Sequence, residues 1–197
     1  FTGRNPSNYV PSSKFNGYQH DLTHPVEQVT WTQCMEVMSR LGLELPSEAQ
    51  WDCGCRGGTD TPWWTGAERE SLRGKVNLAD QTAAKAGAPW SDIKDWPDLE
   101  DGWAVHAPVG SLPSNPYGLH EVHGNVWEWC RDGYANNYTA GKQVDPMTPW
   151  DGASNRVNRG GSFINAASNA RSAIRSGSTP EISGDDLGLR PARAFTP

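Results

Sequence analysis

Four cysteines have the widest chemical repertoire of the residues in this chain. Cys34, Cys53, Cys55 and Cys130 are each able to act as a nucleophile, a soft metal ligand or a disulfide partner. No two of them have CxxC spacing, and Cys53 and Cys55 are too close in sequence to pair comfortably with each other. We therefore interpret the four as reduced thiols, buried or inert, with disulfides between distant pairs as the alternative.

The histidines are the second set of candidates for chemistry. The string HEVH places His120 and His123 three residues apart, whereas the helical zinc motif HExxH places its two histidines one helical turn apart. The spacing therefore does not predict zinc. We interpret His20, His24 and His106 as hydrogen-bonded structural histidines or surface residues rather than ligands, and no Ser-His-Asp or Cys-His arrangement follows from spacing.

Composition excludes two classes of partner. The net charge is -6 and the 17 Lys and Arg residues are scattered, so the electrostatic attraction that nucleic-acid binding requires is missing. No apolar run approaches the roughly 20 residues that span a bilayer, and Phe1 begins no signal peptide. We expect no nucleic acid and no membrane span. No compartment is assigned, with the cytoplasm slightly favoured.

Two short helices are predicted near the start. Cys34, Val37, Met38 and Leu41 recur at helical spacing after Thr30, and Gly42 is placed to end that helix. In the next segment Ser47 and Gln50 have the spacing of a capping box, and Gly57 and Gly58 follow as a stop.

The rest of the chain predicts little regular structure. Residues 1–29 read as loop, and the stretch 59–116 lacks periodicity and is long enough to need an extra organiser such as a metal ion. Short strands are predicted at 126–130, 156–163 and 187–193. Trp127 and Trp129 fall in the first of these, and we expect one to pack inward and the other to approach a metal-binding loop.

Five ordered segments resemble the formylglycine-generating enzyme, or sulfatase-modifying factor, family. They are HPVEQVTW (24–31), LELPSEAQWDCGCRGG (43–58), YGLHEVHGNVWEW (117–129), RVNRGGSF (156–163) and LGLRPAR (187–193). The resemblance implies an α+β fold of the modified C-type lectin type, with two short helices, small twisted antiparallel sheets and extensive irregular loops. It implies one domain over 1–197, without the usual start of the family domain before Phe1.

The resemblance also implies two structural calcium sites. The first set is Asn77, Leu78, Asp101 and Trp103, and the second is Glu121, Gly124, Val126 and Glu128. Asparagine and carboxylate side chains with main-chain carbonyls give a hard oxygen donor set, which suits calcium rather than zinc. The alternative is that the two glutamates are solvated acids and that the segment around Asn77 is an ordinary turn.

Copper is not expected. The oxidase of the family binds copper through two cysteines just after the GGS motif, because thiolate is the soft ligand that holds Cu(I). In this chain the two positions are Asn165 and Ala170, and no cysteine lies beyond Cys130. The resemblance therefore implies a member without the formylglycine-generating activity.

The C-terminal segment predicts a binding surface. Aliphatic side chains beside Ser, Asn, Gly and Asp in loops make sense where another molecule covers them, the alternative being that each isoleucine fills the core. The pattern also resembles the variable proteins of diversity-generating retroelements, in which a set of codons is randomised on a fixed frame. The candidate ligand-binding residues are Ile164, Asn169, Ile174, Ser176, Gly177, Ser178, Ile182, Ser183, Gly184, Asp185 and Asp186.

These observations favour a non-catalytic, calcium-stabilised ligand-binding domain with a C-terminal, diversified binding surface. A protein or peptide is the expected ligand, and other domains of a larger chain are expected partners. Two alternatives stay open: an oxidoreductase of the same family that uses non-standard site residues, and a regulatory or recognition module of a larger protein. The lectin fold by itself is no evidence for sugar binding.

Overall fold

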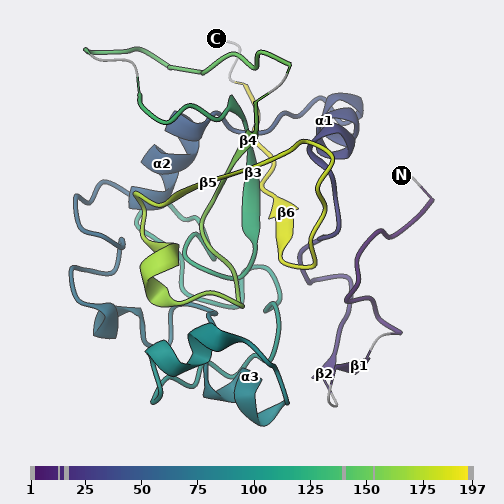
Figure 1. Ribbon diagram of the computed structural model, residues 1–197, viewed down its shortest axis with the longest axis vertical. Helices are drawn as coiled ribbons and strands as arrows, with labels where there is room; N and C mark the ends of the chain where they lie inside the picture. Colours follow the sequence, from purple (N-terminus) through teal and green to yellow (C-terminus); the bar gives the residue numbers. More distant parts are fainter. Residues whose placement is uncertain (1–2, 13, 16–17, 139–140, 153, 195–197) are drawn as a thin grey trace.

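The computed structural model describes residues 3–12, 14–15, 18–138, 141–152 and 154–194. A central four-stranded sheet has α1 and α2 at its upper end and α3 below it (Figure 1). The helices are α1 (Trp31–Arg40), α2 (Glu48–Arg56) and α3 (Gln81–Lys85), with 3-10 turns at Arg69–Leu72, Ser91–Asp95 and Ala167–Ala170. The strands are β1 (Lys14–Phe15), β2 (Tyr18–Gln19), β3 (Trp127–Gly133), β4 (Arg156–Arg159), β5 (Arg175–Ser178) and β6 (Leu187–Leu189).

Both predicted helices form, and side-chain caps fix where they begin. Thr30 caps α1 and Ser47 caps α2, each in a complete capping box with the glutamine three residues later. Gly57 ends α2 in the left-handed conformation, and a Cβ atom there would lie 2.8 Å from Pro116 Cδ. The capping signals in the sequence therefore set the helix bounds correctly.

The sheet has the order β5-β4-β3-β6 and is mixed rather than purely antiparallel. β3 pairs antiparallel with β4, and β4 pairs antiparallel with β5. β6 runs parallel to β3, with Trp127 opposite Leu187 and Trp129 opposite Leu189. The chain leaves β5 at one edge of the sheet and crosses to β6 at the other edge, so residues 179–186 form the connection between the two edges.

Trp127 and Trp129 lie on the same side of β3, so the expectation that one would point elsewhere is wrong. Trp129 is fully buried with Val29 and Met38, and Trp127 packs against the same cluster. Residues two apart in a strand share a face, which is the physical reason. The Trp129 indole N–H donates to Val29 O at 3.0 Å, and this contact ties α1 to the sheet.

Most residues of one hydrophobic cluster come from the stretch 59–116. Trp63, Leu72, Leu78 and Trp96 are buried together, and Ala170 from the C-terminal half completes the cluster. The stretch also contains α3, where Asp80 caps the helix by accepting from Ala83 N at 2.9 Å. Buried indoles therefore organise loops whose sequence shows no period.

The four cysteines are free, as the sequence predicts, and Cys53 is the exposed one. Among the described residues no helix is both long and apolar enough to cross a bilayer.

Candidate functional site

The loop after β4 contains Asn165 and Ala170, where the sequence resemblance implies the two copper-binding cysteines of the family would lie. Gly160 and Gly161 both have positive φ, and a Cβ atom on Gly161 would lie 3.1 Å from Ala170 Cα. Two glycines are therefore needed for the chain to turn back onto the core at this point. The turn buries Phe163 and Ala170 and leaves Ile164 and Asn165 partly buried.

Asn165 acts as a hydrogen-bond acceptor at the first of these positions. Its Oδ1 accepts from Trp127 Nε1 at 2.9 Å and from Ser162 N at 3.1 Å. Ser162 Oγ lies 2.9 Å from the same oxygen and 2.8 Å from Asp186 Oδ2. Ala170, at the second position, is fully buried in the core cluster of Trp63. Both side chains therefore have structural roles and neither offers a thiolate.

The buried thiols are poor replacements for the missing pair. Burial raises the pKa of Cys34 and of Cys55 to about 12, and it raises the pKa of Cys130 well above its usual value. Cys55 Sγ lies 3.7 Å from His123 Nδ1 and 3.6 Å from Val122 O. Because the thiolate is the nucleophile and the metal ligand, these protonated thiols are inert at neutral pH.

The predicted ligand-binding residues lie in three segments. Ile164 and Asn169 are partly buried in the loop after β4, with Ile164 packed against the cluster of Tyr9 and Phe163. Ile174 precedes the edge strand β5, which contains Ser176, Gly177 and Ser178, all partly buried. The third segment is 182–186, in which Ile182 is 50% exposed and Ser183 is exposed.

The connection 182–186 approaches Asn165. Ser162 links Asp186 to Asn165, and Trp127 N donates to Asp186 O at 2.8 Å. Burial raises the pKa of Asp186, while the hydrogen bond from Ser162 acts in the opposite direction. The hydroxyl of Tyr9 donates to Asp185 Oδ2 at 3.4 Å. Asp185 and Asp186 therefore join this loop to the core, whereas Ile182 and Ser183 face outward.

Arginines hold the frame around these loops. Arg159 is fully buried, donates to Ile174 O and Asp52 Oδ1, and places Nε 3.3 Å from Glu48 Oε1. Arg175 donates to both oxygens of Glu48, at 2.5 and 2.7 Å. Arg171 is exposed and bonds only locally among the described contacts, to Ser168 O at 2.9 Å.

The first predicted calcium set contains a buried oxygen without a hydrogen-bond partner and a carboxylate whose ionised form is destabilised. Asn77 Oδ1 is buried without a hydrogen-bond partner among the described residues. Asp101 accepts from Leu78 N at 2.9 Å and from Trp103 N at 2.8 Å, so three of the four residues are joined directly, while the Asn77 amide donates to Val105 O at 2.8 Å. Burial raises the pKa of Asp101, and the neighbouring Asp80 carboxylate raises it further. Asp101 N also donates to Asp80 Oδ2 at 2.6 Å, so two carboxylates lie close together, an arrangement of hard oxygen donors that fits calcium.

The second predicted set already has donors for its carboxylates. Glu121, with φ of 51°, accepts from Gly110 N and Leu112 N, both at 2.9 Å. Glu128 accepts from Trp51 Nε1 at 2.7 Å and forms a two-point ion pair with Arg190 at 2.7 and 2.9 Å. Calcium at this set stays a prediction, because the arginine already neutralises Glu128.

The two predicted calcium sets lie next to each other, because main-chain atoms of the second set contact Asn77 of the first. Gly124, with φ of 83°, runs so close to Asn77 that a Cβ atom would lie 2.2 Å from Asn77 O. Asn125 N donates to the same oxygen at 2.9 Å. Val126, the remaining member of the second set, is buried immediately before β3.

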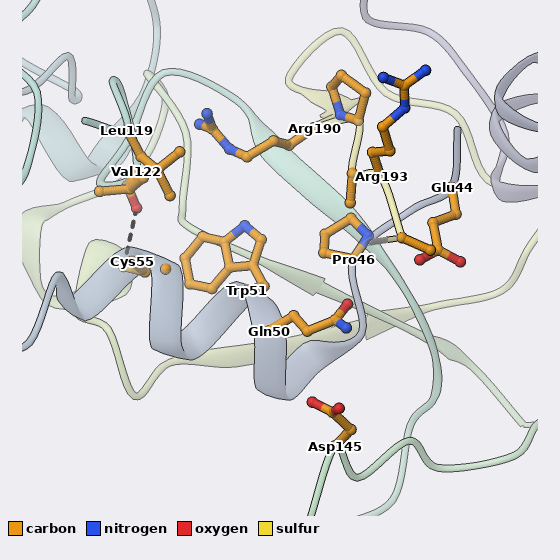
Figure 2. Close-up of a pocket in the computed structure, with 14 residues that line it drawn as sticks. Glu44, Pro46, Gln50, Trp51, Cys55, Leu119, Val122, Asp145, Arg190 and Arg193 are labelled. Carbon is orange, nitrogen blue, oxygen red and sulfur yellow. Dashed lines mark hydrogen bonds between the residues drawn. The ribbon is translucent and has the colours of Figure 1, made fainter. Parts of the chain in front are cut away.

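A pocket lies between α2 and the chain that follows β6. Figure 2 shows Trp51 between Gln50 and Arg190, with Leu119 and Val122 at one end. Its volume is about 530 Å³. Arg190 belongs to the Glu128 ion pair and also donates to His120 O at 2.8 Å, so its guanidinium holds the wall of the pocket together.

Three histidines that are far apart in the sequence come together in space. The ligand nitrogens of His20, His24 and His106 all lie within 4.8 Å of one another. His24 and His106 are hydrogen-bonded and buried or partly buried, in line with the sequence interpretation, but the sequence did not predict the cluster itself. The sequence signal for this cluster was the four-residue spacing between His20 and His24. The third member is 82 residues from His24.

Comparisons with known proteins place this geometry in a family. Residues 5–195 match the sulfatase-modifying factor enzyme 1-like domain. The formylglycine-generating enzyme of Mus musculus is 32% identical over 190 residues, which are 95% of this chain and 49% of that protein. The inactive C-alpha-formylglycine-generating enzyme 2 of Bos taurus is 31% identical over 192 residues, covering 91% of this chain and 54% of that protein.

The chain thus spans about half the length of these curated relatives. Treponema denticola variable protein 1 superposes with a TM-score of 0.75 at 24% identity, covering 98% of this chain and 78% of that chain, and this likeness concerns the fold alone. The relatives include a protein named as an enzyme and one named as inactive. With its α+β, C-type-lectin-like architecture and a match over nearly its whole length, this chain belongs to the sulfatase-modifying factor enzyme 1-like family.

Proposed function

We propose that this chain is a non-catalytic ligand-binding domain, stabilised by calcium, whose C-terminal segments bind a protein or peptide. The observation that carries the proposal is the state of the two copper positions. Asn165 is held as an acceptor by Trp127 and Ser162, and Ala170 is sealed in the core. A redox metal that requires two thiolates has no ligands there.

Calcium at the first set is supported by the unsatisfied Asn77 Oδ1, by the buried carboxylate of Asp80 and by the partly buried carboxylate of Asp101. Bound calcium would supply positive charge between the segments 77–80 and 101–103. Asn77 and Asp101 would hold it through side-chain oxygens, with main-chain carbonyls of Leu78 and Trp103 beside them. Its role here is structural, since it would fix the loops that pack under the sheet.

Binding is supported by the distribution of exposure along the C-terminal segments. Ile182 is 50% exposed, and its neighbours Glu181 and Ser183 are exposed as well. The loop around Ile182 is held by main-chain bonds from Trp31 N to Pro180 O and from Gln28 N to Gly184 O, and the preceding strand β5 is joined to α2 by the ion pair of Arg175 with Glu48. A stiff scaffold that presents a polar loop with an outward aliphatic side chain suits recognition of another molecule. We also propose that the codons of this segment are diversified, as the pattern of amino acids suggests.

Oxygen consumption tests the non-catalytic half of the proposal. The purified chain is mixed with Cu(I) and a cysteine-containing peptide, and the double variant Asn165→Cys/Ala170→Cys is measured beside it. We expect no thiol-dependent oxygen uptake and no tight Cu(I) binding by the wild-type chain, and Cu(I) binding by the folded double variant. Metal-dependent oxygen uptake by the wild-type chain would establish the oxidoreductase alternative instead.

A peptide selection tests the binding half. A displayed library of random peptides is selected on the purified chain, and the affinity of a recovered peptide is measured for Ile182→Ala and for the control Val144→Ala. Val144 is 87% exposed but lies outside the predicted surface. Re-exposing roughly half an isoleucine side chain is worth about 1 kcal/mol, so Ile182→Ala should weaken binding about fivefold and the control should not. Failure to select any peptide, or an equal response of the two variants, contradicts the proposal.

A further inference from the structure

Three imidazole rings meet where the N-terminal segment packs against residues 105–107. His20 follows β2, His24 lies four residues later, and His106 belongs to the buried segment that precedes Ala107. Their ring centroids are 5.1 to 5.4 Å apart. His24 Nδ1 and His106 Nδ1 lie 3.0 Å apart, and the candidate ligand atoms of all three lie within 4.8 Å.

These distances suit a shared ion. Two nitrogens bound to one metal at about 2.0–2.1 Å in tetrahedral geometry lie about 3.3 Å from each other. The separation of His24 and His106 is already in that range, and the third ring has to move by roughly 1 Å or more to complete the set. His20 and His24 lie outside helices and strands, so such a movement leaves the regular elements intact.

The three rings lie in a mostly buried setting. His20 and His106 are buried and His24 is partly buried. The neutral imidazole is the form that binds metal, because its lone pair is then free.

Glu27 stands behind His106 in the position of an outer carboxylate. It is fully buried and accepts from Asn8 N at 3.0 Å and Tyr9 N at 2.9 Å. His106 Nε2 is buried without a hydrogen-bond partner among the described residues and lies 3.9 Å from Glu27 Oε1. In metal sites a histidine that binds through one nitrogen usually donates its other N–H to a carboxylate. Binding of an ion through Nδ1 would direct the Nε2 proton of His106 toward Glu27, and a shortening of the 3.9 Å separation would complete the hydrogen bond.

The cluster opens toward solvent on one side. His24 lines a groove of about 950 Å³ that runs between the N-terminal segment and α1. Leu22 and Val26 also line the groove, and both are exposed. A metal held by three histidines therefore keeps a fourth position that water or a ligand carboxylate is able to reach.

We propose that His20, His24 and His106 bind a divalent first-row transition ion of the zinc type, with Glu27 orienting His106 and the fourth position open to the groove. The site is independent of the predicted calcium sets, since imidazole nitrogen suits zinc and the calcium sets consist of oxygen donors. The competing explanation is a metal-free cluster in which His24 donates its Nδ1 proton to His106 Nδ1 or to His106 O, the latter 3.1 Å away.

Zinc titration of the purified chain, after treatment with a chelator, distinguishes the two. We expect one Zn²⁺ per chain by calorimetry, binding that excess Ca²⁺ does not displace, and the visible absorption of tetrahedral Co²⁺ when cobalt replaces zinc. His24→Gln changes a partly buried ligand and should weaken Zn²⁺ binding at least 100-fold. Glu27→Gln should weaken it 10- to 100-fold, because it removes the partner of a ligand and not the ligand itself.

His120→Gln serves as the matched control. His120 is also partly buried and hydrogen-bonded, with Nδ1 2.7 Å from Leu112 O, but it lies outside the cluster. The zinc affinity of the His120→Gln variant should stay within twofold of the wild-type value. Far-ultraviolet circular dichroism and metal-free melting of each variant establish that it is folded, and ring nitrogen NMR shifts of the wild-type chain report ligation directly. No zinc binding by the wild-type chain, or equal losses in His24→Gln and His120→Gln, overturns the proposal.

Discussion

Substituting Glu48 by glutamine is the sharpest test of how the fold supports its C-terminal surface. Glu48 begins α2 and is only 2% exposed. Its carboxylate accepts two hydrogen bonds from Arg175, lies 3.3 Å from Arg159 Nε and accepts from the Tyr138 hydroxyl at 3.1 Å. Arg175 begins β5, so this one acid connects a helix to the strand that contains Ser176 to Ser178.

The magnitude follows from what the substitution leaves behind. Arg159 is fully buried, and the side chain of Arg175 is 12% exposed, so Glu48→Gln leaves two guanidinium groups without their shared counter-charge. Asp52 still accepts from Arg159 at 2.7 Å, and the rings of Tyr134 and Tyr138 still face Arg175. Breaking a buried ion pair from one side destabilises by about 3–5 kcal/mol, and these remaining partners favour the lower end, about 3 kcal/mol.

Urea unfolding followed by tryptophan fluorescence measures the loss. The control is Glu36→Gln, which removes an exposed pair with Arg40 one helical turn away and should change the free energy of unfolding by less than about 1 kcal/mol. A cycle that adds Arg175→Met should show coupling with Glu48→Gln of about 1–3 kcal/mol, because the two groups are in direct contact. A loss below about 1 kcal/mol for Glu48→Gln, or no coupling to Arg175, refutes the view that this network holds β5.

Three further outcomes are expected. Gly124→Ala should lower the free energy of unfolding by about 3 kcal/mol or more, because Gly124 has positive φ and its Cβ would lie 2.2 Å from a carbonyl oxygen. Gly141 also has positive φ but open space around it, so Gly141→Ala should cost only about 1 kcal/mol, and urea unfolding compares the two variants. Of the four thiols, only Cys53 should react with a thiol reagent at pH 8 in the folded chain, and all four in urea, because burial raises the pKa of the other three; prompt labelling of a second thiol contradicts this. Calcium at 100 times its dissociation constant should stabilise the chain by about 2.7 kcal/mol, or roughly 5–10 °C in melting temperature, and Asp101→Asn but not Asp98→Asn should abolish the response to a calcium chelator.

The sequence predicted those parts of the fold whose signals are local. Capping boxes at Thr30 and Ser47 and the left-handed Gly57 depend on neighbours within a few residues, so the bounds of α1 and α2 followed from spacing. β5 was not predicted because Arg175–Ser178 has low strand propensity and exists through its pairing with β4. The parallel pairing of β6 with β3 likewise depends on a connection that no local pattern records.

The same distinction applies to the sites. Asn165 and Ala170 lie within ten residues of the GGS motif, so the lack of thiolate ligands at these positions was predictable from residue type and spacing. The histidine cluster was not predictable, since His106 reaches His24 only through the folding of the segment between them. The residue types of the two predicted calcium sets are similar, so nothing in the sequence favoured one over the other. The structure shows a difference, because Glu128 of the second set is paired with Arg190, which lies 62 positions away in the sequence.

The contacts of the C-terminal segments show which of their residues can bind a ligand without also holding the fold together. Asp186 shares Ser162 with Asn165, and Asp185 meets Tyr9, so changing either acid disturbs the frame as well as the surface. Ile182 faces outward, and main-chain bonds from Trp31 N to Pro180 O and from Gln28 N to Gly184 O hold the backbone on either side of it. Ser183 is exposed as well, but its hydroxyl donates to Gln28 Oε1 at 3.2 Å. Stability in this region therefore resides in main-chain and frame contacts, which is the condition under which outward side chains can change without loss of the fold. Of the predicted binding residues, those nearest Ile182 meet that condition best.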